Sequence, residues 1–279
     1  MKTSTDPLLS IITVTFNDRV ALESTLASCR RQRGEREDCE FIVIDGGSTD
    51  GSHEIIGTFH DVITAYASEP DRGIYDAMNK GLAAASGTYV MYLNAGDVWA
   101  DESSLQAVRQ ALVDNESCEW LIGGAVTLDG GKSARRIKNI PHSWLRHAFG
   151  IQPHCHQSTF VRRALMSSIG GFSEAYEFAG DFDLILRIGL IAPPAYLDRV
   201  VVTYAGGGVS AINGAKIPRL QHRIRSDRFQ MSPIVRTLDL SYVRYQLLRR
   251  GLHPYVSLVK GLVQSERRTR CETESPNNH

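Results

Sequence analysis

The sequence has no excess of charge of either sign, no long apolar run and no close pair of cysteines. Its 31 Lys and Arg residues balance 31 Asp and Glu residues, which argues against general binding to nucleic acid. No stretch approaches the roughly 18 apolar residues that a membrane-spanning helix needs, so we expect no transmembrane segment. The scattered cysteines favour reduced thiols in the cytoplasm over a disulfide framework. They are Cys29, Cys39, Cys118, Cys155 and Cys271.

The sequence also shows no secretory leader and no internal repeat. Met1 to Pro7 is polar and runs directly into an apolar segment, so we expect a protein that is made and used in the cytoplasm. With 279 residues, of which 42% are hydrophobic and 22% charged, the chain is long enough to bury a substantial core.

Strand and helix patterns alternate along most of the chain, which predicts an α/β fold with a doubly wound, mostly parallel sheet. We expect a catalytic domain over residues 8–215, a basic helical segment over 216–271 and a disordered tail over 272–279. The expected strands are Leu8–Phe16, Phe41–Ile44, Val62–Ala67, Thr88–Leu93, Trp120–Leu128, Cys155–Val161 and Tyr196–Tyr204. The expected helices are Val20–Gln32, Ser52–His60, Ile74–Ala85, Asp101–Asn115 and Leu184–Ile191.

One stretch, Ser68 to Asp97, combines a turn, a helix and a buried strand that ends in polar residues. Pro70 to Gly73 has the residues of a turn, and Gly87 stops the helix that follows it. The next apolar run leads to Asn94 and Asp97, so a carboxylate is expected at the carboxyl edge of a parallel sheet. Ligands bind at that edge in open α/β sheets.

Four motifs in this order resemble those of the family-2 glycosyltransferases. They are Thr13–Asn17, Val43–Gly51, the stretch Ser68–Asp97, and Gly180–Leu184. The resemblance covers about residues 8–214 and is nearest to bacterial enzymes of exopolysaccharide, colanic-acid-like or O-antigen synthesis. It implies the Rossmann-like GT-A fold and inverting transfer from a nucleoside-diphosphate sugar.

The resemblance places a divalent cation, Mg²⁺ or Mn²⁺, at Asp97, where it would neutralise the departing diphosphate. The family usually has a second acid at this strand end, whereas this chain has Asn94 and Gly96. The alternative is that Asp97 caps the following helix. By the same resemblance, the donor side comprises Thr13, Phe16, Asp45, Asp71, Lys80 and Asn94.

Several of these donor residues also have simpler interpretations. Phe16 is a core residue in the alternative interpretation, and Lys80 is a solvated charge on a helix. Asp50, in the same loop as Asp45, is interpreted as the N-cap of the helix that starts near Ser52.

Asp181 is the candidate general base, because an inverting transfer needs a carboxylate that deprotonates the acceptor hydroxyl. The family places this acid in a Glu-Asp-x-Asp-like motif, and this chain keeps the Asp but has Gly180 in place of the Glu. Asp183 is the rival base. In the alternative interpretation it caps the helix or anchors Arg187, four residues further on.

His156 and Gln157 resemble a His-Gln pair on the acceptor side of the family's site. His154 and His156 would share one face of a strand, which suggests a zinc site, but no partner set with zinc spacing is visible. The glycine-rich loop Gly206–Ser210 either closes over the diphosphate or is an ordinary turn.

The implied function is inverting transfer of a sugar to a hydroxyl of a glycan or lipid-linked oligosaccharide in cell-surface polysaccharide synthesis. The alternatives are a non-catalytic nucleotide-sugar or glycan-binding partner and a sugar nucleotidyltransferase. The segment Tyr242–Arg270 mixes arginines with leucines and valines. It is interpreted as a peripheral membrane contact, or as helices packed on the catalytic domain or in a homodimer.

Overall fold

The computed structural model describes residues 6–32, 38–129, 133–137, 141–152, 154–205, 214 and 216–249. The contacts between residues divide the chain into two compact units, Met1–Ile212 and Asn213–His279. The loop Gly206–Ser210, the part of the Tyr242–Arg270 segment beyond Arg249, and the tail 272–279 lie outside the described residues.

The first half of the sheet is parallel, as the alternating pattern predicts. Its strands are β1 (Leu9–Thr15), β2 (Cys39–Asp45), β3 (Ala65–Ser68) and β4 (Tyr89–Tyr92), in the spatial order β3-β2-β1-β4. The helices α1 (Arg19–Arg30), α2 (Ser52–Thr58) and α3 (Ile74–Ala84) connect them. β3 begins later than the expected Val62, because the amides of Val62 and Ile63 bond to the carbonyl of Phe59 in the turn that ends α2.

The second half of the sheet is mixed. Its strands are β5 (Val98–Trp99), β6 (Trp120–Asp129), β7 (Ser133–Ile137), β8 (Thr159–Arg162) and β9 (Ala195–Ala205). β8 lies antiparallel between β4 and β6, β9 runs parallel to β6, and β5 and β7 pair antiparallel with β9 and β6. The α/β class is confirmed, and the doubly wound parallel pattern applies to the half that contains β1 to β4.

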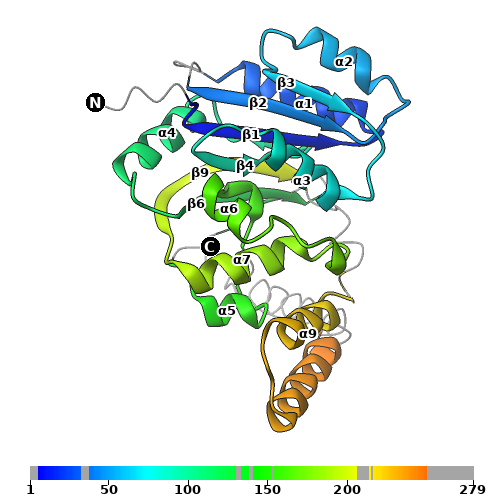
Figure 1. Ribbon diagram of the computed structural model, residues 1–279, viewed down its shortest axis with the longest axis vertical. Coiled ribbons are helices and arrows are strands. Elements are labelled where there is room, and N and C mark those ends of the chain that lie inside the picture. Colours follow the sequence, from blue (N-terminus) through cyan, green and yellow to red (C-terminus); the bar gives the residue numbers. More distant parts are fainter. Residues whose placement is uncertain are drawn as a thin grey trace, which may run out of the picture. The chain divides into compact units, whose positions relative to one another are not determined.

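The apolar residues of the parallel strands alternate between the two faces of the sheet. On one face, α1, α2 and α4 (Ser104–Asp114) pack over Leu9 and Ile11. On the other face, α3, α6 (Arg163–Ser168) and α7 (Gly180–Ile191) pack over Ile12 and Val14. Figure 1 shows α3, α6 and α7 together on this second face. Both faces are therefore covered, and the carboxyl ends of the strands are left for ligands.

Short elements follow β7: α5 (Trp144–Ala148), the 3₁₀ turn η1 (His156–Ser158) and the 3₁₀ turn η2 (Glu174–Tyr176). The strand expected over Cys155–Val161 is wrong in its first part. The amide of Ser158 donates a hydrogen bond to the carbonyl of Cys155, which closes a 3₁₀ turn, and the hydroxyl of Thr159 donates to the same carbonyl. α7 starts four residues before the expected Leu184, so Asp181 and Asp183 both lie in its first turn.

The second unit contains α9 (Ile217–Arg228) and a helix over residues 233–249. Asp239 of the second helix pairs with Arg225 of α9 at 2.9 Å and contacts Nδ1 of His222, also on α9, at 2.6 Å. Both Arg225 and Asp239 are buried. This charge cluster links the two helices. Within the described residues, no helix is both long enough and apolar enough to span a membrane.

Candidate active site

Asp97 lies in the loop after β4, at the carboxyl edge of the sheet, and only 6% of it is exposed. The hydroxyl of Thr25, on α1, accepts a hydrogen bond from the amide of Gly96 at 2.9 Å and donates one to the carbonyl of Asp97 at 2.8 Å. Gly96 has φ +93°, which allows the sharp turn before Asp97. The helix-capping interpretation of Asp97 is wrong, because β5 follows it and Ser103 is the N-cap of α4.

Asp181 lies in the first turn of α7, with 29% of its side chain exposed. Its Oδ1 accepts a hydrogen bond from the amide of Phe182 at 2.8 Å, and its own amide donates to the hydroxyl of Tyr75, on α3. Burial, the largest single influence, raises the pKa of Asp181, but the hydrogen bond and charge of His156, the amide of Phe182 and the nearby His147 together outweigh burial, so the pKa lies below its usual value. The carboxyl group is therefore ionised at neutral pH, as a general base must be.

His156 connects the loop that carries Asp97 with Asp181. Its Nε2 lies 3.4 Å from Nδ2 of Asn94, in the loop that carries Asp97. Its Nδ1 lies 3.5 Å from Oδ2 of Asp181. The loop of Asp97 and the start of α7 therefore meet at one place, although the two acids are 84 positions apart in the sequence.

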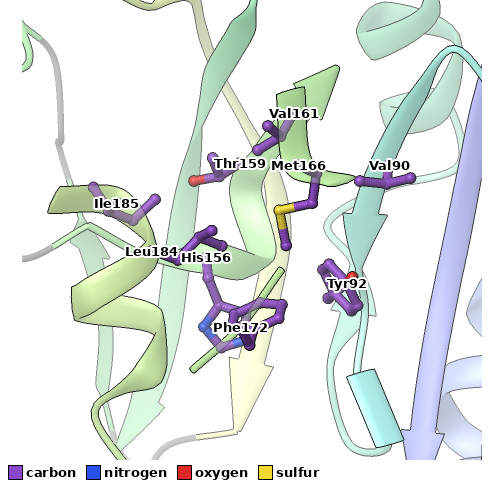
Figure 2. A pocket seen from close by; sticks show the side chains of 9 residues that line it. All are labelled: Val90, Tyr92, His156, Thr159, Val161, Met166, Phe172, Leu184 and Ile185. Atoms are coloured by element: carbon purple, nitrogen blue, oxygen red, sulfur yellow. The ribbon is translucent and has the colours of Figure 1, made fainter. Parts of the chain in front are cut away.

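Figure 2 shows His156 at a small cavity beside this link. The cavity has a volume of about 10 Å³, which is room for no more than roughly one water molecule, so it is not a sugar-binding pocket. Its other lining residues are Val90, Tyr92, Thr159, Val161, Met166, Phe172, Leu184 and Ile185.

Among the residues expected on the donor side, Phe16 has an exposed ring next to an acid. Phe16 directly follows β1 and is 62% exposed, so the interpretation of Phe16 as a core residue is wrong. A Cβ atom at Gly46 would lie 3.1 Å from the Phe16 ring and would collide with Oδ2 of Asp71. Phe16 and Asp71 therefore flank a glycine at the ends of β1 and β2. Thr13, in contrast, is buried inside β1.

Two other residues expected on the donor side, Asp45 and Lys80, bind protein groups. Asp45 is fully buried and accepts hydrogen bonds from the amide of Ser48 and, at 2.6 Å, from the hydroxyl of Ser68. Lys80 pairs with Glu69 at 2.8 Å and donates to the carbonyl of Pro70.

Asp50 accepts hydrogen bonds from the amides of Arg19 and Ser52. The N-cap of α2 is Gly51, so the capping interpretation of Asp50 is off by one residue.

On the acceptor side, the two other candidates also have protein partners. Asp183 is fully buried and accepts a hydrogen bond from Nε of Arg187 at 2.8 Å, as the anchoring alternative predicts. Arg187 also donates to the carbonyls of Ile169 and Gly171. The Oε1 of Gln157 accepts a hydrogen bond from the thiol of Cys155 at 3.0 Å.

Sequence reasoning missed two contacts that hold α7 and the segment leading to it. Asn79 of α3 makes two hydrogen bonds with the backbone of Phe172, in the segment before η2 and α7, at 2.8 and 2.9 Å. His147 of α5 is buried and contacts the carbonyl of Phe182 at 2.9 Å, and burial lowers its pKa to about 4, so it is neutral. A family motif includes Asn79, but nothing in the sequence around His147 indicates this contact.

The site fits a divalent cation that shares its coordination with a substrate. Within the described part of the chain, no three His, Cys, Asp or Glu side chains gather closely enough to hold a metal by themselves. Asp97 is a buried carboxylate at the carboxyl edge of the sheet. Mg²⁺ usually takes one or two protein carboxylates, and phosphates and water complete its octahedron. His154 contacts the ring of His142, and neither His154 nor His156 belongs to a group of three possible metal ligands within the described residues.

Comparison with known proteins gives a consistent result. The model of the family described as Glycosyl transferase family 2 matches residues 10–165. An uncharacterized glycosyltransferase of Mycobacterium tuberculosis is 33% identical over 206 residues, which are 74% of this chain and 78% of the relative.

Two solved structures share the fold. Staphylococcus aureus TarS 1-349 in complex with UDP-GlcNAc has a TM-score of 0.63 at 16% identity, over 88% of this chain and 72% of TarS. The mannosyltransferase PcManGT of Pyrobaculum calidifontis, in complex with GDP-Man and Mn²⁺, has a TM-score of 0.61 at 18% identity, over 94% of this chain and 81% of PcManGT.

Proposed function

The chain belongs to glycosyltransferase family 2 and has its GT-A fold, and we propose that it transfers a sugar, with inversion, from a nucleoside-diphosphate sugar to a glycan hydroxyl. The observation that carries this proposal is the contact chain from Asn94 through His156 to Asp181. It connects the loop of the candidate metal ligand, Asp97, with the candidate base. A displacement reaction needs these two functions on opposite sides of the same carbon atom.

On the donor side, Phe16 and Asp71 flank the position proposed for the nucleoside, and Asp97 would hold the divalent cation. A bound cation would neutralise negative charge on the departing diphosphate. Oδ1 of Asn94 is buried and has no hydrogen-bond partner among the described residues. A buried acceptor without a partner is costly, and a hydroxyl of the donor would satisfy it.

On the acceptor side, Asp181 takes the proton of the attacking hydroxyl. The hydroxyl oxygen forms the new bond to the anomeric carbon, while the bond from that carbon to the diphosphate oxygen breaks and its electron pair leaves with the diphosphate. The proton stays on Asp181 until solvent removes it. This direct displacement needs no covalent intermediate on the protein.

The test is a screen for release of nucleoside diphosphate. The chain is incubated with UDP-, GDP- and dTDP-sugars, with Mn²⁺ or Mg²⁺ and glycan acceptors, and the anomeric configuration of the product is read by NMR. We expect metal-dependent release from one donor class and an inverted product. Retention of configuration, or release that Asp181→Asn leaves intact, would refute the mechanism.

The screen also separates this proposal from its rivals. A non-catalytic partner would bind UDP or GDP without turnover, and Asp181→Asn would bind equally well. A sugar nucleotidyltransferase would instead consume a nucleoside triphosphate and a sugar phosphate.

A lipid-linked acceptor is supported by the helix over residues 233–249. Ile234, Leu238 and Leu248 are 66–74% exposed, and their spacing places them on one face of the helix. Arg244 and Arg249 flank this face. An apolar face beside cations suits an anionic membrane surface, which is where a lipid-linked glycan would be met.

Co-sedimentation with phosphatidylglycerol vesicles tests the membrane contact. We expect binding that salt weakens and that Leu238→Asp abolishes, with no binding to phosphatidylcholine vesicles. If the protein ignores both vesicles and Leu238→Asp instead converts a homodimer to a monomer, the face is a dimer contact and the membrane proposal is wrong.

A further inference from the structure

Both ring nitrogens of His156 face protein groups. Nε2 lies 3.4 Å from the side-chain amide of Asn94, and Nδ1 lies 3.5 Å from the carboxylate of Asp181. Contacts of this length in a ligand-free catalytic site commonly shorten when the substrate binds. Neither nitrogen is therefore left over for a sugar hydroxyl, which disagrees with the acceptor-binding role that the sequence suggests for His156.

The contact with Asn94 determines which nitrogen of the neutral ring carries the proton. Nδ2 of Asn94 is a donor only, so Nε2 of His156 must accept and Nδ1 must carry the hydrogen. Nδ1 can then donate to Oδ2 of Asp181. If the Asn94 amide were turned around, its oxygen would face Nε2, and Nε2 of a neutral ring would then carry the hydrogen. The lone pair of Nδ1 would point at the carboxylate of Asp181, which is unfavourable.

We propose that His156 is a positioning residue for Asp181, with Asn94 fixing its tautomer. Nδ1–H of His156 holds Oδ2, while the amide of Phe182 holds Oδ1 at 2.8 Å, so the carboxylate is fixed from both sides. Each oxygen keeps a second lone pair, which is available for the proton of the acceptor hydroxyl. This inference rests on the proposed role of Asp181 as the base.

The surroundings support this role. His156 lines the cavity of Figure 2 together with Leu184 and Ile185, which lie on the same helix as Asp181. The apolar lining leaves the ring few other polar partners. The ionisable groups that face Asp181 are His156 from η1, Tyr75 from α3 and His147 from α5. His147 is neutral, and Tyr75 also contacts Asp181, so His156 is the histidine whose ring nitrogen can hold Oδ2 of the base.

The arrangement also connects the two halves of the reaction. Asn94 belongs to the donor loop, and its Oδ1 is the buried oxygen assigned to a donor hydroxyl. Binding of the sugar nucleotide would restrain the Asn94 amide, because one hydrogen bond at Oδ1 fixes the direction of Nδ2. The bound sugar nucleotide would then fix the tautomer of His156 and the hydrogen bond from His156 to Asp181.

The experiment compares His156→Ala, His156→Gln and Asn94→Ala with the control His60→Gln, which changes an exposed histidine on a turn. Release of UDP or GDP, from whichever donor class the screen selects, is measured from pH 4 to 9 with Mn²⁺. Binding of the same nucleotide is measured by calorimetry, and folding by circular dichroism.

We expect His156→Ala to lower kcat by about tenfold to hundredfold, which is typical of a misplaced catalytic group, with little change in nucleotide binding. The acid limb of the kcat/KM profile should move to higher pH, because the base loses a hydrogen bond that favours its charged form. His156→Gln should restore part of both effects, since its amide can donate to Asp181. Asn94→Ala should move the limb in the same direction, and His60→Gln should change neither quantity.

An unmoved acid limb in folded His156→Ala, with a raised KM for the acceptor, would overturn the inference and make His156 an acceptor-binding residue. Asp181→Asn separates this failure from failure of the proposed function. If Asp181→Asn is inactive while the His156 profiles match the wild type, only the inference fails. If Asp181→Asn is active, the assignment of the base itself is wrong.

Discussion

Asp181 and Asp183 lie two residues apart on α7, and the structure predicts opposite consequences of changing them. Asp183 is fully buried and pairs with Arg187, whose side chain is 13% exposed. Removing one partner of a buried pair costs about 3–5 kcal/mol, because the other charge is left uncompensated. Arg187 keeps its bonds to the carbonyls of Ile169 and Gly171, so we expect Asp183→Asn to cost about 3 kcal/mol, the lower end of that range.

For a domain of this size, 1 kcal/mol lowers Tm by about 2–4 °C, so Asp183→Asn should lower Tm by about 6–12 °C. Asp181 is partly exposed, and among the described residues it contacts no Lys or Arg side chain but the ring of His156. Asp181→Asn should therefore leave Tm nearly unchanged and lower kcat by about 10²–10⁴-fold, the usual contribution of a general base.

The assay is thermal unfolding by circular dichroism, alongside release of nucleoside diphosphate at a temperature where both variants are folded. Under these conditions, Asp183→Asn should keep most of its activity. If Asp183→Asn is fully stable but inactive, and Asp181→Asn is active, then Asp183 is the base and the reasoning from burial is refuted.

Three further predictions concern the metal, the packing of α3 and acid stability. EDTA should abolish nucleotide release, Mn²⁺ or Mg²⁺ should restore it, and Asp97→Asn should not respond to either metal; activity in EDTA would contradict this. Gly81→Ala should lower the free energy of unfolding in urea by about 1–3 kcal/mol, because the added Cβ would collide with a β1 side chain. Gly57→Ala, whose added Cβ meets no atom, should raise it by about 0.5–1 kcal/mol. Equal effects of the two substitutions would contradict the packing. Burial would raise the pKa of Glu40, but hydrogen bonds from serine and backbone donors outweigh it, so the pKa is lowered from 4.5. The stabilising contribution of Glu40 is thus present above pH 4.5 and is lost as pH falls through the folded pKa. The free energies of unfolding of Glu40→Gln and the wild type should therefore differ less at pH 3 than at pH 7. A difference that does not change with pH would refute this prediction.

The parallel half of the fold could be predicted from the sequence because its signals are local. Each strand from β1 to β4 is a short apolar run, and each helix between them has its own periodicity and turn residues. The carboxyl ends of such strands meet at one edge, so Asp97 could be assigned to the ligand side. The error at β3 was also local, because apolar Val62 is buried in a turn rather than in a strand.

The rest of the site depends on contacts between distant segments. Nothing local to His156 shows that η1 places its ring between Asn94 and Asp181, since the pairing of β8 with β4 and β6 decides this. Likewise, Asp183 could be interpreted as a base or an anchor until its burial was known. A short sequence motif specifies residue types, whereas burial and long-range pairing specify which of them is free to react.

The central claim is that two acids have separate tasks, with Asp97 serving the donor and metal, and Asp181 serving the acceptor. Calorimetric titration of UDP and GDP with Mn²⁺ into the wild type, Asp97→Asn and Asp181→Asn tests it most directly when combined with turnover of the same samples. We predict that Asp181→Asn binds the nucleotide like the wild type but does not turn over, whereas Asp97→Asn loses metal-dependent binding. Equal nucleotide binding by all three proteins, or turnover by Asp181→Asn, would contradict the claim.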